Sequence, residues 1–196
     1  MTDLTQTVRI GSLFSGVGGL DMAVEQSFGG RVIWHAETDP DAAKVLAHRF
    51  SGVPNLGDVS KIAWHDVPLV DVMCGGFPCQ DLSEAGGRAG LRNGTRSGLW
   101  ACFAAGIAAL QPRHVVIENV KGIRSAKAHR NLESGDSGLG TSNVLRALGA
   151  VLGDLSEIGY DAKWSTVAAY DVGAPHRRER VFILAEIRGA ADSTQP

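Results

Sequence analysis

Cysteine is scarce in this chain of 196 residues, and its three members, Cys74, Cys79 and Cys102, form no metal-binding pattern. There is no Cys-x-x-Cys pair and no His-Cys cluster, so we do not expect a zinc site or any other metal. The count is odd, and the sequence does not open with a basic segment followed by an apolar run. Both features argue against a disulfide framework and predict a reducing compartment, the cytoplasm.

Long apolar runs and internal repeats are missing as well. No stretch approaches the ~18 apolar residues of a transmembrane helix, so we expect no membrane association. Apolar residues make up 44% of the chain and charged residues 20%, which is typical of a soluble globular protein. The length suits one domain, which we place at residues 1–188 with a short tail at 189–196.

The formal net charge of -2 is unfavourable for a general nucleic-acid binder, but the charge is unevenly distributed. Residues 86–130 hold eight basic side chains and one acid, Glu118. A basic face on an acidic body fits a local site for a polyanion. Solvated loop arginines would give the same count, so charge alone does not decide between these interpretations.

Segments rich in β-formers alternate with helix-like segments, which predicts a doubly wound α/β sheet. The expected strands are residues 8–14, 31–37, 55–57, 70–74, 114–120, 163–169 and 180–187. The expected helices are residues 19–28, 39–50, 99–110 and 142–158, with Asp39 as an N-cap and Pro40 at the first helical position. Two long loops, 75–98 and 121–140, remain between them, and long loops in compact domains are usually functional.

The last two strands are joined by residues 170–175, a connection too short for a helical crossover. We therefore expect strand 180–187 to be antiparallel to its neighbours. The prediction is a mixed seven-stranded sheet with helices on both faces. Its strand order, counted along the chain, is 3-2-1-4-5-7-6.

A glycine-rich turn at residues 14–20 (FSGVGGL) follows the first strand. Glycine lets the backbone approach a ligand at the carboxyl edge of such a sheet. Asp21 stands where a dinucleotide fingerprint has its third glycine, which weakens an NAD interpretation. Glu37 ends the second strand and suits a ribose diol, whichever cofactor carries it. A plain tight turn and a solvated acid would look the same.

Cys79 lies in the segment GFPCQ, directly after the buried strand 70–74. Ligands bind at this edge of the sheet, and Pro78 stiffens the loop. Free cysteine is often a core residue, and that interpretation suits Cys74 and Cys102. It does not suit Cys79, whose neighbours are a Gly-Gly turn and polar side chains.

Two further segments carry charged groups to the same edge. Glu118, in Glu-Asn-Val, follows four apolar residues, which predicts a partly buried acid that can stay protonated and donate to a ring nitrogen. A loop-bonding acid is the alternative. Arg178 and Arg180 enter the last strand, where alternation would place both on one face, ready for phosphate or carbonyl oxygens. Surface ion pairs, such as Arg177 with Glu179, are the alternative there.

Taken in order, these segments resemble the DNA cytosine-C5 methyltransferase family over nearly the whole chain, and Pro-Cys-Gln and Glu-Asn-Val are the most specific marks. The resemblance implies a Rossmann-like methyltransferase fold, S-adenosylmethionine as methyl donor, double-stranded DNA with a flipped cytosine as substrate, and a bacterial or phage-encoded protein. Catalysis is implied for Cys79, Glu118, Arg178 and Arg180. Cofactor binding is implied for Phe14, Ser15, Gly16, Val17, Gly19, Leu20, Glu37, Thr38, Asp58, Val59 and Pro78.

The mechanism implied by the resemblance is covalent. Cys79 adds to C6 of cytosine, Glu118 holds or protonates N3, and Arg180 binds O2 while Arg178 supports the loop or a phosphate. The base is flipped out of the duplex, and loop 86–96 closes over it.

Some features depart from the family pattern. His176 stands where the family often has glutamine, and Thr38 replaces an aromatic residue that some members stack on adenine. The family continues with a target-recognition region and a returning segment that completes the cofactor pocket, and neither fits after Ile187.

Four interpretations therefore stay open beside a DNA methyltransferase that needs a missing C-terminal part. These are half of a split enzyme completed by a second chain, an inactive remnant that binds cofactor or DNA, a tRNA methyltransferase, and an NAD-type oxidoreductase suggested by fold alone.

Overall fold

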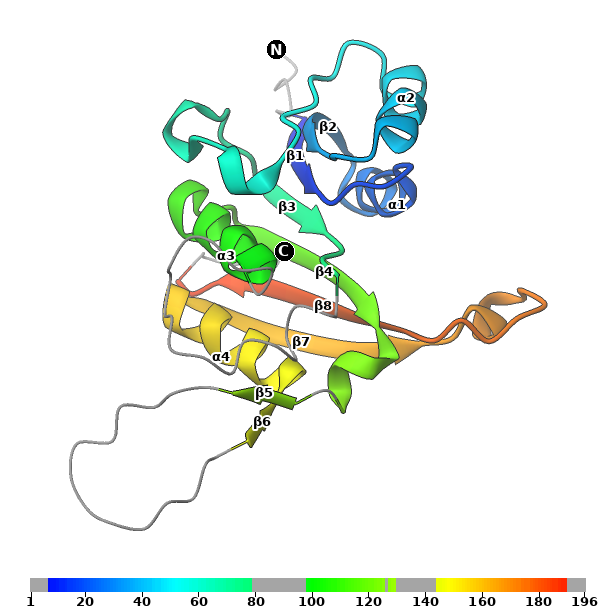
Figure 1. Ribbon diagram of the computed structural model, residues 1–196, viewed down its shortest axis with the longest axis vertical. Coiled ribbons are helices and arrows are strands. Elements are labelled where there is room, and N and C mark those ends of the chain that lie inside the picture. Colours follow the sequence, from blue (N-terminus) through cyan, green and yellow to red (C-terminus); the bar gives the residue numbers. More distant parts are fainter. Residues whose placement is uncertain (1–6, 79–97, 126, 130–143, 190–196) are drawn as a thin grey trace, which may run out of the picture.

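The computed structural model describes residues 7–78, 98–125, 127–129 and 144–189 (Figure 1). Cys79, most of the predicted loop 75–98, the closing loop 86–96 and most of loop 121–140 lie outside the described residues.

Six strands form one mixed sheet in the order β2-β1-β3-β4-β8-β7. They are β1 (Val8–Leu13), β2 (Gly30–Ala36), β3 (Val72–Gly75), β4 (His114–Val120), β7 (Tyr160–Val167) and β8 (Arg180–Ile187). The first four run parallel, and β8 is antiparallel to both β4 and β7. The prediction that residues 180–187 form an antiparallel strand is confirmed.

The predicted seventh strand, residues 55–57, is absent, so the seven-stranded order was wrong. The segment makes a single parallel bridge, His35 to Asn55, beside β2. Pro54 has no N–H to extend a ladder, and Gly57 turns the chain away with a φ of 74°. The six strands that do form keep the expected relative order.

Four α-helices connect the strands: α1 (Gly19–Phe28), α2 (Pro40–Arg49), α3 (Gly98–Leu110) and α4 (Ala147–Ile158). Asp39 caps α2 as predicted, its carboxylate accepting from the N–H groups of Asp41 and Ala42 at 3.0 and 2.8 Å. The predicted helix 142–158 starts later, because β6 (Val144–Arg146) pairs with β5 (Lys127–His129) in a small separate sheet. Short 3-10 turns η1 (Val59–Lys61), η2 (Trp64–Asp66), η4 (Lys121–Arg124) and η5 (Ala169–Val172) complete the elements.

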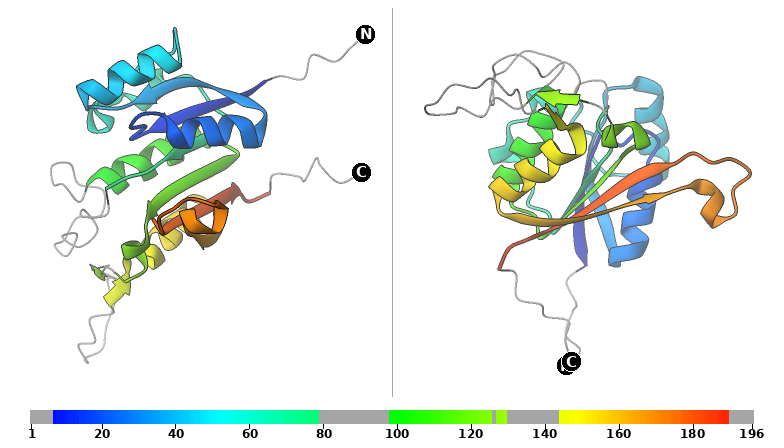
Figure 2. Two further views of the ribbon diagram at one scale, coloured as in Figure 1. Left: turned by 90° about the vertical axis from the view of Figure 1, so that its right-hand side faces the viewer. Right: turned by 90° about the horizontal axis from the view of Figure 1, so that it is seen from below.

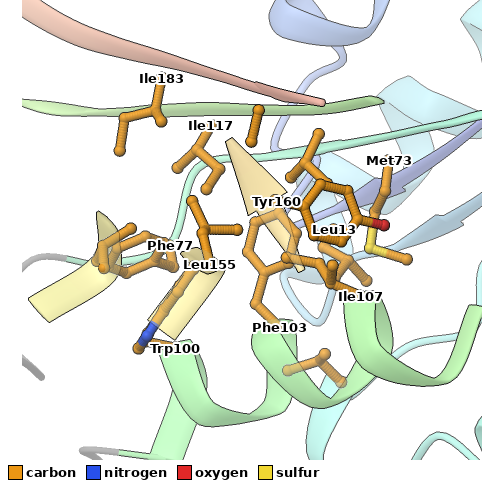
Figure 3. Close-up of a cluster of buried hydrophobic side chains, with 14 of the residues drawn as sticks. Leu13, Met73, Phe77, Trp100, Phe103, Ile107, Ile117, Leu155, Tyr160 and Ile183 are labelled. Atoms are coloured by element: carbon orange, nitrogen blue, oxygen red, sulfur yellow. The ribbon is translucent and has the colours of Figure 1, made fainter. Parts of the chain in front are cut away.

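The helices lie on both faces of the sheet (Figure 2). Helices α3 and α4 cover one face, where the main core forms from Trp100, Phe103, Leu155, Ile117 and Ile183 (Figure 3). Helix α1 covers the β1, β2 and β3 part of the opposite face, where a smaller cluster lies. This is the layered arrangement expected of a doubly wound sheet.

The remaining half of the α1 face is bare among the described elements. On β8, Val181, Ile183 and Ala185 are buried against α3 and α4, whereas Phe182 and Leu184 on the other face are 36% and 46% exposed. Beyond them, the arm that carries η5 projects from the sheet (Figure 1), and its Tyr170 is 71% exposed. Large apolar side chains on one sheet face are typical of a surface that another element covers.

Candidate active site and cofactor cleft

The glycine turn follows β1 at the carboxyl edge of the sheet, and its backbone is left-handed at several positions. The φ angles are 53° at Phe14, 54° at Gly16 and 83° at Gly18. A side chain at Gly16 or Gly19 would project into open space. The turn therefore forms a cradle in which glycine leaves room for a ligand.

Glu37 is joined to this turn directly. Its Oε2 accepts a hydrogen bond of 2.7 Å from the Gly16 N–H, and its Oε1 accepts one of 2.8 Å from the Asp39 N–H. The predicted pairing of the glycine turn with the strand-end acid is thus a contact in the structure. Each carboxylate oxygen retains a further lone pair for a hydroxyl group.

Asn55 fixes the backbone of Glu37, a role that sequence reasoning missed. Its Oδ1 accepts from the Glu37 N–H, and its Nδ2 donates to the Glu37 carbonyl, both at 3.0 Å. The signal was present in the turn sequence Pro54-Asn55, but the segment was interpreted as a strand. The segment predicted as a strand therefore serves instead to fix the backbone of Glu37, the residue expected to bind the ribose.

Two adjoining clefts lie along this edge and share Phe14 and Gly76. One, of about 440 Å³, is lined by Glu37, Thr38, Asp58, Val59 and Pro78 among others. The second, of about 530 Å³, is lined by Ser15, Gly16, Gly19, Leu20, Glu118, Arg178 and Arg180 among others. Most of the residues predicted for cofactor and catalysis therefore gather at one edge.

Two of the predicted cofactor residues have other contacts. Asp58 caps η1 by accepting from the Ser60 N–H and hydroxyl, and these bonds lower the pKa of its carboxyl. Val17 is half exposed, and its carbonyl accepts from Arg49 at 3.1 Å. Contact of either side chain with a nucleoside stays a prediction.

Glu118 and Arg180 meet across β4 and β8. The Nε of Arg180 lies 2.8 Å from Oε1 of Glu118, and the two side chains are 22% and 28% exposed. Gly76 passes so close that an added Cβ would lie 3.1 Å from Oε2 of Glu118. The acid, the guanidinium and the start of the Cys79 loop therefore converge.

The prediction that Arg178 and Arg180 lie on one face because they alternate along one strand was wrong, since only Arg180 belongs to the strand. β8 begins at Arg180, and Arg178 precedes it with a φ of 30°. Both still line the same cleft. The suggested pairing of Glu179 with Arg177 is replaced by an ion pair with Lys121 at 2.7 Å.

Asn119 ties the end of β4 to the loop that leads to Cys79. Its side chain is buried, its Nδ2 donates to the Phe77 carbonyl at 2.9 Å, and its Oδ1 accepts from the Val120 N–H at 2.8 Å. This anchoring role was not predicted from the sequence, although Asn119 stands in the Glu-Asn-Val segment.

Replacing Asn119 by alanine is expected to lower the free energy of unfolding by about 1–3 kcal/mol, because it leaves the buried Phe77 carbonyl without its donor. Urea denaturation measures this loss. Ser27→Ala removes an exposed hydroxyl that bonds to its own helix and should change stability by less than about 0.5 kcal/mol. Equal values for the two variants would contradict the anchoring role of Asn119.

The two other cysteines lie where the core interpretation placed them. Cys74 is fully buried in β3, and burial raises the pKa of its thiol well above the ordinary value. Cys102 lies on α3, half-buried, and burial also raises the pKa of its thiol. Neither thiol is suited to act as a thiolate nucleophile.

Comparison with known proteins identifies the family of this chain. The profile of a family described as C-5 cytosine-specific DNA methylase matches residues 8–190. The chain belongs to this family. Type II methyltransferase M2.BsuMI of Bacillus subtilis (strain 168) is 35% identical over 184 residues, which cover 92% of this chain and 42% of that protein.

A second curated relative and a solved structure are also similar to this chain. Type II methyltransferase M.NlaIV of Neisseria lactamica is 30% identical over 192 residues, which are 95% of this chain and 43% of the relative. A crystal structure of a DNMT2 mutant from Spodoptera frugiperda shares the fold with a TM-score of 0.71 at 18% identity, over 94% of this chain and 51% of that one. This C5 methylase chain thus spans less than half the length of these two curated relatives.

Within the described ranges, no helix is both long and apolar enough to cross a membrane. In the same part of the chain, no group of His, Cys, Asp and Glu side chains is arranged to hold a metal ion.

Proposed function

We propose that this chain is the catalytic and cofactor-binding part of an S-adenosylmethionine-dependent DNA cytosine-C5 methyltransferase with Cys79 as its nucleophile. One observation carries the proposal. The Glu118–Arg180 pair, at 2.8 Å, lines the same cleft as the glycine turn joined to Glu37. A group that recognises a base and a group that recognises a nucleoside are therefore neighbours at one sheet edge.

The residues present fit the cofactor. The adenosine part suits the cleft lined by Glu37, Thr38, Asp58 and Val59, with Glu37 accepting from the ribose hydroxyls. Phe14, shared by both clefts, would mark the passage to the amino-acid part, beside Ser15, Gly16, Gly19 and Leu20. When bound, S-adenosylmethionine supplies an electrophilic methyl group.

Cytosine C5 is a poor nucleophile, and side chains of this protein would make it more reactive. The Cys79 thiolate forms a bond to C6, and the electron pair of the C5–C6 double bond becomes available at C5. Glu118 holds or supplies a proton at N3 while Arg180 contacts O2, so that charge does not accumulate on the ring. After C5 has gained its methyl group it loses its proton to a base, the double bond re-forms, and Cys79 leaves as thiolate.

Position supports the role of Cys79 although that residue lies outside the described part of the chain. Pro78, directly before it, lines the nucleoside cleft, and the carbonyl of Phe77 is fixed by Asn119. The loop therefore leaves the sheet between the two clefts. Arg178 and Arg180 line the adjoining cleft, and an electropositive setting of this kind favours the thiolate form of a cysteine.

DNA as substrate, rather than tRNA, is part of the proposal because the matching family profile is one of DNA methylases. The base must leave the duplex to reach Cys79. Recognition of a sequence is assigned to a further C-terminal part or a second chain. The exposed Phe182 and Leu184 on the bare sheet face support this assignment, since they offer an apolar surface to such an element.

Glu37→Ala tests the cofactor assignment. It should weaken binding of S-adenosylhomocysteine by about 1–3 kcal/mol, the range for a lost hydrogen bond to a charged group. Calorimetric titration gives the affinity, and a thermal melt verifies folding. Asp41→Ala is the matched control, because it removes the same charge from an exposed position on α2 and should leave the affinity unchanged. If Glu37→Ala binds as tightly as the parent, the nucleoside pocket has been misplaced.

A further inference from the structure

A polar cluster lies sealed beneath the glycine turn. Ser12 of β1, Asp21 of α1 and His35 of β2 are each 1% exposed or less, and Cys74 of β3 completes the group. In the sequence, Asp21 stands out only because it departs from a dinucleotide fingerprint. The structure places its carboxyl group in the first turn of α1, at the buried floor of the cleft whose lining includes Ser12, Ser15 and Asp21.

Asp21 is incompletely bonded within the described part of the chain. Its Oδ1 accepts from the Cys74 thiol at 3.6 Å, whereas its Oδ2 has no hydrogen-bond partner there and lies 4.0 Å from Nδ1 of His35. Both ring nitrogens of His35 also lack a partner among the described residues, and its ring contacts Phe50 edge-on. A buried polar atom without a hydrogen-bond partner destabilises the fold, so such atoms often have a functional reason.

The charge states of the cluster follow from burial. Burial raises the pKa of Asp21 to about 6, with a smaller increase from Glu25 one turn along α1, while the Ser12 hydroxyl and the Cys74 thiol oppose the rise. Burial lowers the pKa of His35. Above pH 7 the carboxyl is therefore charged and the imidazole neutral, and near pH 5 the carboxyl holds a proton.

Two hydroxyl groups connect this carboxyl to the cleft. Ser12 stabilises the charged form of Asp21, and its Oγ lies 2.8 Å from Oγ of Ser15. Each hydroxyl has one hydrogen to donate. A charged Asp21 can only accept, so it favours a Ser12 hydroxyl turned toward it, a Ser15 hydroxyl that donates to Ser12, and Ser15 lone pairs left for the cleft. A protonated Asp21 can itself donate, which favours the reverse order.

We infer that Asp21 is a positioning residue that sets, through Ser12, the hydrogen-bond polarity of Ser15, so that Ser15 accepts from the ammonium group of the cofactor's amino-acid part. This inference rests on the proposed function, because it assigns the amino-acid part of S-adenosylmethionine to the cleft that Ser15 lines. The ammonium group is a donor without lone pairs, so it matches the first polarity and not the reversed one.

Stability and affinity then respond to pH in opposite directions. Because the folded protein binds the Asp21 proton more tightly than the unfolded chain does, the parent gains stability relative to Asp21→Asn as pH falls through about 6. Cofactor affinity is lost over the same interval. A residue with a merely structural role would move both quantities together.

The test is calorimetric titration with S-adenosylhomocysteine between pH 5 and pH 8. For the parent we expect affinity about tenfold weaker one pH unit below the midpoint, since the competent fraction there is about one tenth. Asp21→Asn, which cannot titrate, and Ser12→Ala, which cuts the connection, should show flat profiles. His35→Gln should keep the drop. Methylthioadenosine, which lacks the amino-acid part, should bind with no such pH dependence.

A flat profile for the parent, or a drop that persists in Ser12→Ala, overturns the inference. In the ligand-free protein, the amide resonances of Ser15 and Gly16 should titrate near pH 6 and lose that response in Ser12→Ala; failure here overturns the inference without reference to any ligand. If they titrate while S-adenosylhomocysteine does not bind at pH 8, the proposed cofactor function is what fails, and the hydrogen-bond relay from Asp21 to Ser15 stands.

Discussion

Cys79→Ser is expected to abolish methyl transfer, with a loss on the order of 10³-fold or more, because a serine hydroxyl is a far weaker nucleophile than a thiolate at neutral pH. No other cysteine lines the two clefts among the described residues, and Glu118 is paired with Arg180. The measurement is transfer of a labelled methyl group to DNA by the chain supplemented with the proposed C-terminal part or partner chain. The same preparation should form a covalent complex with DNA that carries 5-fluorocytosine, because fluorine at C5 blocks release of the cysteine.

Cys102→Ser provides the matched control for this variant. It makes the same atomic change at a thiol on α3 whose pKa is raised by burial, so both transfer and the covalent complex should be retained. A covalent complex that forms equally well with Cys79→Ser would show that another group attacks C6. Loss of the complex in both variants would point to damage of the fold, which a thermal melt distinguishes.

The fold could be predicted to the extent that local signals agreed with burial. The alternation of apolar strands with capped helices located α1, α2 and α3 to within about two residues, which is the usual uncertainty of such boundaries. The short connection 170–175 correctly gave an antiparallel β8. What failed was pairing that depends on distant partners: residues 144–146 join Lys127–His129 rather than extending α4, and no local pattern announces that choice.

The candidate site was predicted residue by residue but not in its connections. Glu37 and Gly16 were both named, and the structure joins them at 2.7 Å. Asn55 and Asn119 were missed because their bonds go to backbone carbonyl and N–H groups of distant segments, which a sequence does not display. Asp21 was noticed because it replaces a glycine of the dinucleotide fingerprint. Its surroundings come from three strands, β1, β2 and β3, whose convergence around it could not be predicted from the sequence.

Residues 1–196 alone are expected to bind DNA weakly and to transfer little or no methyl to it. The proposed nucleophile and the pair Glu118–Arg180 would act on a base that has already been recognised and flipped out of the duplex, and the proposal assigns recognition to a further part or a second chain. Basic side chains in the segment 86–130 would supply phosphate contacts, which are independent of sequence and weaken steeply with salt. The dissociation constant for DNA at physiological salt should therefore lie between about 10⁻⁶ and 10⁻⁴ M, the range of non-specific binding.

Supplying the proposed C-terminal part or partner chain should restore both rate and specificity, because specific complexes bind about 10³-fold or more tighter than non-specific ones. The bare face offers a direct test of where that part docks. Leu184→Asp places a charge on an exposed position of β8; the isolated chain should fold and bind S-adenosylhomocysteine as before, whereas restoration by the added part should fail. Glu186→Gln, which removes a charge that pairs with Arg113 and His114 at an exposed position on the same strand face, is the control and should permit restoration. Labelled methyl transfer measures each case. Robust, sequence-selective transfer by residues 1–196 alone would contradict the prediction. Recognition of the target sequence would then have to come from the segments already present.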